Sequence, residues 1–308
     1  MRLLTFTESG RSRAGFEVDG TIVDLAGAIA ASSGSAGIDS SSVLAVLEGG
    51  DLAMTAARNA ATWARAELAN GRTPSGKNGA TIAFSRAEVK LNAPIPRPGK
   101  IICLGLNYAD HAAEGGSQLP AAPMFFAKFA NAIVGTDDTI VLPRASSQMD
   151  YEAEFAFVIG KKAKHVALTD ALDYVAGYMN LDDVSARDLQ SETTQFYRGK
   201  GGDTWAPCGP YLVTKDEVAD PHALSIKCFV NGELMQNSNT KYLIFNVPFL
   251  IHQLTQTVTL DPGDLITTGT PSGVGAARKP PYRLKAGDVV RVEVQGLGVL
   301  ENTCVDED

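Results

Sequence analysis

A run of alternating prolines constrains this chain more than any other short segment. Residues 92–100 read Asn-Ala-Pro-Ile-Pro-Arg-Pro-Gly-Lys. Each proline removes a backbone hydrogen-bond donor and fixes φ, so this segment cannot form a helix or a central strand. We therefore predict that it begins a new unit, with a small N-terminal domain over residues 1–91 and a larger domain over residues 92–308.

The residues before this boundary predict a small α+β unit. Short strands are expected at Leu3–Phe6, Ala14–Val18 and Thr21–Leu25, with an Asp19-Gly20 turn between the last two. An alanine-rich segment, Asp51–Ala69, predicts a helix that stops at Asn70-Gly71.

The residues after the boundary predict many strands and few helices. The best helix candidates are Ser185–Gln195 and Asn246–Gln256. The expected strands are Ile101–Leu104, Met124–Lys128, Ile140–Leu142, Glu152–Ile159, Val175–Leu181, Tyr211–Thr214, Ser225–Val230, Asp264–Thr268 and Val289–Val294. This pattern favours a mixed α/β, β-rich fold with a curved core over a doubly wound sheet.

Charge and hydropathy exclude several classes of partner. The net charge is −8 with scattered Lys and Arg, whereas a nucleic-acid binder would show a basic face. The longest strongly apolar stretch, Leu243–Ile251, is interrupted by Asn246 and Pro248, so no membrane span is expected.

The four cysteines form no CxxC pair, and an acidic residue comes too early for a secretory signal. These features predict a cytoplasmic protein with free thiols.

Two acidic clusters point to a metal site. Glu152 and Glu154 lie on one face of a predicted strand, because strand side chains alternate. A second predicted strand ends at Asp182-Asp183. Oxygen-only ligands suit Mg²⁺, Mn²⁺ or Ca²⁺ rather than zinc. An isolated Glu-x-Glu is usually a solvated strand end, and the residues alone do not choose between Asp182 and Asp183.

A histidine and a glycine-rich turn add candidate catalytic groups. His111 and Glu114 are spaced to hydrogen-bond on a helical turn, where the carboxylate would orient a general base. Glycines flank this segment, as in a lid that opens and closes, although a surface His–Glu pair has the same spacing. The turn Gly269–Gly275 would offer backbone N–H groups and the Thr270 hydroxyl to an oxyanion, although a purely structural hairpin has the same sequence features. Lys200 lies in a glycine-rich segment and could neutralise a substrate carboxylate or an enolate, although most lysines are simply solvated.

Taken in order, these segments resemble the fumarylacetoacetate hydrolase superfamily, over about Pro94 to Glu301. The residues that carry the resemblance are Gly105-Leu106-Asn107-Tyr108 with His111 and Glu114, Asp150 to Glu154, Asp183 to Gln190, Lys200, Asp203-Thr204, Gly209-Pro210 and Pro262 to Gly275. The resemblance implies a β-roll catalytic domain behind a small N-terminal domain, a homodimer, and bound Mg²⁺ or Mn²⁺.

The resemblance also implies residue roles. Glu152, Glu154 and Asp183 would be the metal ligands. His111, oriented by Glu114, would activate water. Lys200, Gln190 and Thr270 would contact an oxo-acid or its enolate, and Arg187 would contact substrate or serve the structure.

The chain departs from the family pattern at two places. Residues 101–106 hold no carboxylate that could be a fourth metal ligand. The lysine motif reads Lys200-Gly201-Gly202-Asp203-Thr204 where Lys-Ser-Phe-Asp-Thr is common in the family. The missing aromatic side chain predicts a larger or looser wall near Lys200.

The reaction expected from these features is hydrolysis of a carbon–carbon bond in an acylpyruvate-type acid during aromatic or sugar-acid catabolism. The same metal and enolate chemistry would serve decarboxylation of an oxaloacetate-like acid, isomerisation of a 2-hydroxymuconate-type acid, or dehydration. A non-catalytic binding homologue is the alternative from another class. Such a protein would be expected to have lost a metal ligand or the base, and this chain keeps them all.

Overall fold

The computed structural model describes residues 1–32 and 37–308. Its main element is a twelve-stranded sheet with the path β4-β3-β2-β1-β14-β12-β11-β17-β6-β7, to which β5 and β8 are attached through β1 and β14. The strands of this sheet are β1 (Arg2–Glu8), β2 (Arg11–Val18), β3 (Thr21–Asp24), β4 (Ala83–Ser85), β5 (Lys90–Asn92), β6 (Ile101–Gly105), β7 (Met124–Lys128), β8 (Ile133–Val134), β11 (Ala153–Ile159), β12 (Val175–Asp182), β14 (Ala206–Thr214) and β17 (Leu265–Thr267).

A five-stranded sheet and a short ribbon complete the β structure. The five-stranded sheet has the order β16-β15-β18-β19-β9, and the ribbon pairs β10 with β13. These strands are β9 (Thr139–Leu142), β15 (Ser225–Val230), β16 (Glu233–Asn239), β18 (Val289–Val294), β19 (Val299–Asp306), β10 (Met149–Asp150) and β13 (Ser185–Ala186).

Helices are short except for α3 and α7. The α-helices are α1 (Leu25–Ser32), α2 (Val43–Glu48), α3 (Gly50–Ala69), α4 (Ala109–Glu114), α5 (Arg187–Ser191), α6 (Tyr197–Lys200) and α7 (Val247–Thr257). The 3₁₀ turns are η1 (Lys77–Gly79), η2 (Arg86–Glu88), η3 (Ala130–Ala132), η4 (Leu168–Tyr174), η5 (Lys215–Glu217), η6 (Thr240–Tyr242) and η7 (Gly275–Ala277). In the part of the chain that the structure describes, no helix combines the length and apolarity that a membrane crossing requires.

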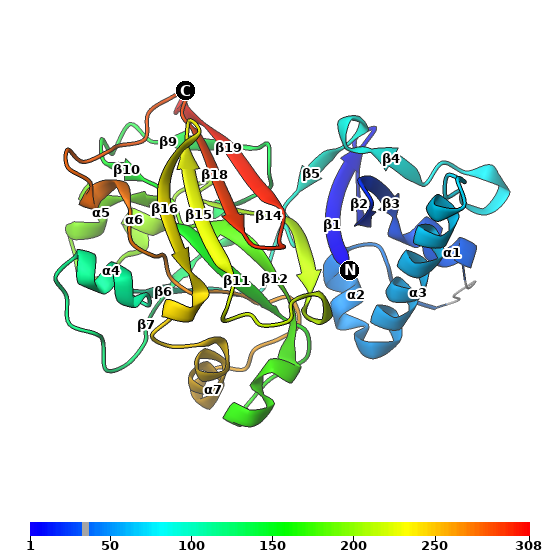
Figure 1. Ribbon diagram of the computed structural model, residues 1–308, viewed down its shortest axis with the longest axis horizontal. Helices are drawn as coiled ribbons and strands as arrows, with labels where there is room; N and C mark the ends of the chain where they lie inside the picture. Colours follow the sequence, from blue (N-terminus) through cyan, green and yellow to red (C-terminus); the bar gives the residue numbers. More distant parts are fainter. Residues whose placement is uncertain (33–36) are drawn as a thin grey trace.

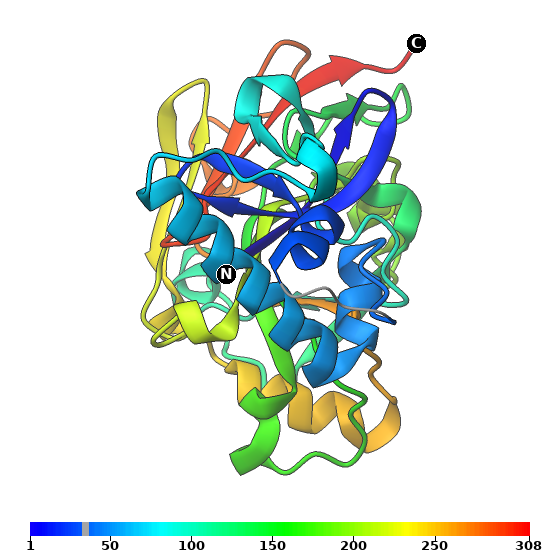
Figure 2. The ribbon, with the colours of Figure 1, turned by 90° about the vertical axis from the view of Figure 1, so that its right-hand side faces the viewer.

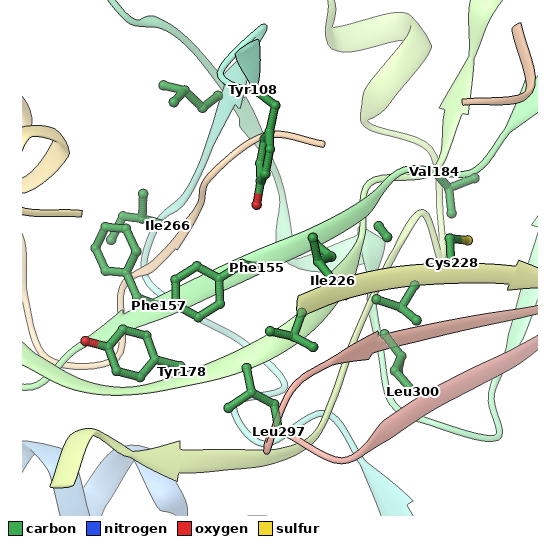
Figure 3. Packing of buried hydrophobic residues seen from close by; sticks show 14 of the residues in the cluster. Tyr108, Phe155, Phe157, Tyr178, Val184, Ile226, Cys228, Ile266, Leu297 and Leu300 are labelled. Atoms are coloured by element: carbon green, nitrogen blue, oxygen red, sulfur yellow. The ribbon is translucent and has the colours of Figure 1, made fainter. Parts of the chain in front are cut away.

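The two larger of three hydrophobic cores in the described residues lie on opposite faces of the large sheet, and β11 contributes to both. Phe155 and Phe157 pack toward the five-stranded sheet, where Figure 3 shows them with Tyr178, Ile226 and Leu297. Ala156 and Val158 belong to the other core, which includes residues of the N-terminal helices. Strand alternation explains this division. Because both faces of β11 are buried, its sequence is an almost unbroken apolar run.

The N-terminal helices form one end of the molecule, on the right in Figure 1 and toward the viewer in Figure 2. The buried face of α3 consists of alanines at helical spacing, from Ala53 to Ala64. Beside these helices, β1 pairs antiparallel with β14, with Leu3 opposite Leu212. The large sheet therefore runs across the proline segment. The predicted division at residue 92 stays a prediction.

The mixed, β-rich architecture is as expected, and one local expectation is corrected. Of the helix expected at Ser185–Gln195, only Arg187–Ser191 is helical, because Ser185 and Ala186 form strand β13. After α5, Thr193 Oγ1 donates a 2.9 Å hydrogen bond to the Gln195 carbonyl, a local bond that competes with helix continuation. Strands β16 and β19 and helices α1 and α2 were not predicted.

Candidate active site

Three carboxylates meet where two neighbouring strands end. Strands β11 and β12 pair antiparallel with Ala153 opposite Asp182, so Glu152 and Asp183 flank the pair at the same end. The Asp183 N–H donates to the Glu152 carbonyl at 2.9 Å. Glu154 projects two residues further along β11. Each of the three offers one ligand oxygen, and these oxygens lie within 4.8 Å of one another. We call Glu152, Glu154 and Asp183 the acidic triad.

The structure separates the two aspartates that the residues alone left equivalent. Asp182 lies outside the triad, and its Oδ1 accepts a 2.8 Å hydrogen bond from the Glu152 N–H. Burial raises the pKa of Asp182 to about 7, against the lowering effect of that hydrogen bond. Asp182 thus holds the backbone of Glu152, while Asp183 offers its carboxylate to the triad.

Two cations neutralise Glu152. Lys200 Nζ donates to Glu152 Oε2 at 2.7 Å and to Asp183 Oδ2 at 2.9 Å. Arg187 Nη1 lies 2.5 Å from Glu152 Oε1, and Arg187 Nε donates to Asp150 Oδ2 at 2.8 Å. Burial opposes ionisation of Glu152, but Lys200 and Arg187 outweigh it and lower its pKa to about 2.

Glu154 lacks comparable support. Its Oε2 accepts a 2.8 Å hydrogen bond from the Gly269 N–H, whereas its buried Oε1 accepts none from any described residue. Burial, followed by repulsion from Asp183 and Glu152, raises the pKa of Glu154 well above its ordinary value. An unsatisfied buried oxygen beside two further carboxylates is the environment that a bound cation would relieve. The triad therefore fits a hard divalent ion such as Mg²⁺ or Mn²⁺.

The predicted base lies on α4. His111 Nδ1 is 3.2 Å from Glu114 Oε2, and Glu114 Oε1 accepts a 2.9 Å hydrogen bond from the Gly273 N–H. One carboxylate thus joins the imidazole to the glycine-rich turn. Ser238, on β16, donates a short hydrogen bond to Asp110 Oδ2 at the start of α4.

A cavity of about 190 Å³ joins these groups. Of the residues predicted for the site, it is lined by His111, Glu152, Arg187, Gln190, Lys200 and Thr270. Glu154 and Asp183 lie behind this lining, and Glu114 contacts it through His111. The hydroxyl of Thr270 already donates to the Ala153 carbonyl at 2.9 Å and accepts from Gln236 Nε2 at 2.8 Å. Its single donor hydrogen is therefore in use.

An apolar wall, one further lining residue and two buried polar residues were not given roles in the site by the sequence. The wall consists of Leu104, Leu106, Met124, Phe126 and Phe196, and Gly105 also lines the cavity. Gln236 Oε1 accepts a 2.9 Å hydrogen bond from the Ala153 N–H, and Gln236 Nε2 donates to Thr270 Oγ1 at 2.8 Å. These two bonds hold β11 against the glycine-rich turn. Lys128 ends β7 with its Nζ 2.7 Å from Asp183 Oδ1. Strand alternation from Phe126 could have placed Lys128 on the cavity side of β7.

The glycines beside Lys200 do not open the wall. A Cβ on Gly201 would meet the Tyr197 ring at 2.3 Å, and one on Gly202 would meet the Trp205 ring at 2.4 Å. Trp205 Nε1 in turn donates to the Val141 carbonyl at 2.9 Å. Rings from outside the motif therefore occupy this space, which corrects the expectation of a looser wall.

Known proteins resemble this chain in sequence and in fold. A family model described as fumarylacetoacetate hydrolase C-terminal matches residues 100–305. The chain is 52% identical over 224 residues to oxaloacetate tautomerase fahd2, mitochondrial, from Xenopus laevis, covering 72% of this chain and 70% of that protein. The fumarylacetoacetate hydrolase of Exiguobacterium antarcticum has a TM-score of 0.79 at 33% identity, over the whole of both chains.

A solved relative also carries a metal. Maleylpyruvate hydrolase from Sphingobium sp. SYK-6, in complex with manganese(II) ion and pyruvate, has a TM-score of 0.76 at 29% identity over the whole of both chains.

The expected cellular location is contradicted. The Xenopus relative is named as mitochondrial, so the cytoplasmic location predicted from the free thiols and the acidic start is wrong. Free cysteines report a reducing compartment and do not identify which one.

Proposed function

Because this chain belongs to the fumarylacetoacetate hydrolase family, we propose that it is a metal-dependent enzyme that interconverts the keto and enol forms of a small 2-oxo dicarboxylic acid of the oxaloacetate type. The observation that carries the proposal is the 52% identity to a protein named oxaloacetate tautomerase. The enolate chemistry first considered as an alternative thus replaces carbon–carbon bond hydrolysis as the leading assignment.

The size of the cavity supports a small substrate. Its volume of about 190 Å³ lies below the roughly 300–1,000 Å³ of sites for drug-sized ligands. A four-carbon acid with a few waters, each taking ~30 Å³ in the liquid, suits this space. A long acyl chain beyond the 2-oxo acid would have to displace the apolar wall of Met124, Phe126 and Phe196.

The charges near the triad support an anionic substrate. The three carboxylates face three cationic side chains, those of Lys128, Arg187 and Lys200. Arg187 is also paired with Asp150, so the carboxylates outnumber the cations by one, and a divalent ion would leave one positive charge in excess. A substrate carboxylate would neutralise that charge. Arg187 Nη2, which has no hydrogen-bond partner among the described residues, is a free donor for a substrate carboxylate.

Glu152, Glu154 and Asp183 would hold the metal, which would supply Lewis-acid polarisation of the 2-oxo group when bound. The chain's own residues would move the proton. His111, held by Glu114, would remove a proton from the carbon next to the carbonyl. Lys200 would donate a hydrogen bond to the oxygen on which negative charge develops. The proton ends on that oxygen, so no water is consumed and no carbon–carbon bond breaks.

A product analysis tests this proposal. The Mn²⁺-loaded protein would be mixed with the enol form of oxaloacetate, and the enol absorbance and the total oxaloacetate would be followed together. We expect faster loss of the enol absorbance, with oxaloacetate conserved and pyruvate absent. The His111→Asn variant and protein treated with chelator serve as controls for the base and for the metal.

Hydrolysis is the second candidate, favoured by the likeness to maleylpyruvate hydrolase. The same His111–Glu114 pair could activate water instead of removing a carbon-bound proton. An acylpyruvate offered to the same preparation distinguishes the two. Cleavage of the acylpyruvate without acceleration of enol loss would overturn the tautomerase assignment, and stoichiometric pyruvate from oxaloacetate would replace it with decarboxylation.

A further inference from the structure

Lys128 is a buried lysine whose three protons are all in use. Its side chain is 0% exposed, and its Nζ donates to the carbonyl oxygens of Val184 (3.2 Å), Trp205 (2.8 Å) and, in a short contact, Lys200. An ammonium group has three donors. Three carbonyl acceptors therefore hold Lys128 in one position.

The contact between Lys128 and Asp183 is consequently one of charge. The ammonium lies 2.7 Å from Asp183 Oδ1, yet this buried oxygen accepts no hydrogen bond from any described residue. Lys128 thus stabilises the charge on Asp183 without occupying the lone pairs of Oδ1. Those lone pairs stay available to a metal ion.

Lys200 is placed differently. Apart from a ring contact with Phe126, its ammonium bonds among the described residues only to the triad, at Glu152 Oε2 and Asp183 Oδ2. It also lines the cavity. A metal ion that binds these oxygens would compete with Lys200, whose side chain can turn toward a substrate. The same ion cannot displace Lys128, because three carbonyl oxygens hold that ammonium group in place.

We propose that Lys128 is a fixed counter-charge behind Asp183 that weakens divalent-metal binding and keeps the bound ion exchangeable. The inference rests on the metal-binding part of the proposed function. A positive charge beside a ligand repels a divalent ion in the low-dielectric interior. Lys128 is therefore a positioning residue that acts through Asp183 and through the backbone of Lys200, and it does not touch the substrate.

Metal titration of Lys128→Met tests this assignment, with Mn²⁺ as the probe and calorimetry as the readout. We expect about tenfold tighter Mn²⁺ binding than in the wild type, equivalent to ~1.4 kcal/mol. The variant itself should be less stable without metal, because three carbonyls lose their donor. Its melting temperature should therefore rise more on addition of Mn²⁺ than that of the wild type.

Lys100→Met is the matched control. Lys100 Nζ also bonds two carboxylates, Asp261 Oδ2 at 2.9 Å and the buried Asp264 Oδ2 at 2.8 Å. It precedes β6, whereas Gly105 at the other end of that strand lines the cavity. Its loss should lower stability and leave Mn²⁺ affinity unchanged.

Lys128→Gln provides a second variant, since an amide removes the charge and keeps donors for the carbonyls. If the wild type binds Mn²⁺ and the Lys128 variants bind it equally or more weakly, the role of Lys128 is overturned. The proposed function would then still stand. Failure of the wild type itself to bind Mn²⁺ or Mg²⁺ would overturn both.

Discussion

The two halves of the candidate site are built on different parts of the fold. The acidic triad lies at the ends of β11 and β12, inside the large sheet, and its side chains are almost completely buried. His111 and Glu114 lie on α4, a six-residue helix, and their side chains are 23% and 24% exposed. The metal half is thus fixed by the sheet, whereas the base half depends on a few contacts made by one short helix.

The contacts of each half explain this difference. Strand β11 is hydrogen-bonded on both sides, to β12 and to β17, so the strand that carries Glu154 is held inside the sheet. Helix α4 has no side-chain N-cap and is held at its ends by Ser238–Asp110 and Gly273–Glu114. This comparison predicts that metal binding and proton transfer can be lost separately.

The largest expected effect is that of Glu154→Gln. The substitution removes a charge from the metal half and places an amide donor or acceptor where Oε1 has no partner. Activity should fall to background, and the rise in melting temperature on adding Mn²⁺ should vanish. Glu88→Gln, in the exposed turn η2, is the control. If Glu154→Gln kept the Mn²⁺-dependent rise, Glu154 would not be a ligand.

His111→Asn should break the base half alone. Loss of a general base costs roughly 10²- to 10⁴-fold in rate, so kcat should fall within that range. The Mn²⁺-dependent rise in melting temperature should match the wild type, because His111 lies outside the triad. A parallel loss of metal binding would show that the two halves are not independent.

The metal half was the more predictable from sequence, for a physical reason. Strand alternation puts Glu152 and Glu154 on one face whatever the rest of the fold. Choosing Asp183 over Asp182 required the family resemblance, because two adjacent acids at a strand end differ only in which way each side chain turns. The structure resolves this choice through the Asp182–Glu152 backbone contact.

The supporting residues could not be predicted in the same way. Lys128 and Gln236 act on partners 55 and 83 residues away in sequence, Asp183 and Ala153, and neither stands in a recognisable motif. The rings over Gly201 and Gly202 likewise come from Tyr197 and Trp205, whose packing is a tertiary property. Local patterns predict which way a side chain points, and not what it meets.

Gly202→Ala should disturb a cavity residue while leaving the triad in place. A Cβ here would lie 2.4 Å from the Trp205 ring, and overpacking of this kind typically costs about 1–3 kcal/mol of stability. The displaced loop carries Lys200, so we expect kcat to fall about tenfold, since each ~1.4 kcal/mol on the barrier is tenfold. Denaturant unfolding and steady-state kinetics measure the two effects. Wild-type stability in this variant would contradict the close packing of Gly202 against Trp205.

The smallest effect is expected from Ser238→Ala, which loosens α4 without touching the base. The substitution removes the donor to Asp110 Oδ2, and a net hydrogen-bond contribution of about 1 kcal/mol corresponds to a roughly fivefold fall in kcat/KM. The Mn²⁺-dependent rise in melting temperature should not change. Asn237→Ala, on the neighbouring exposed position of β16, should have no effect, and Ser238→Thr, which keeps the hydroxyl, should restore activity. If kcat/KM fell as far as in His111→Asn, this one hydrogen bond would hold the whole base half in place. If kcat/KM did not fall, the other contacts of α4, such as Glu114 with Gly273, would be enough to hold it.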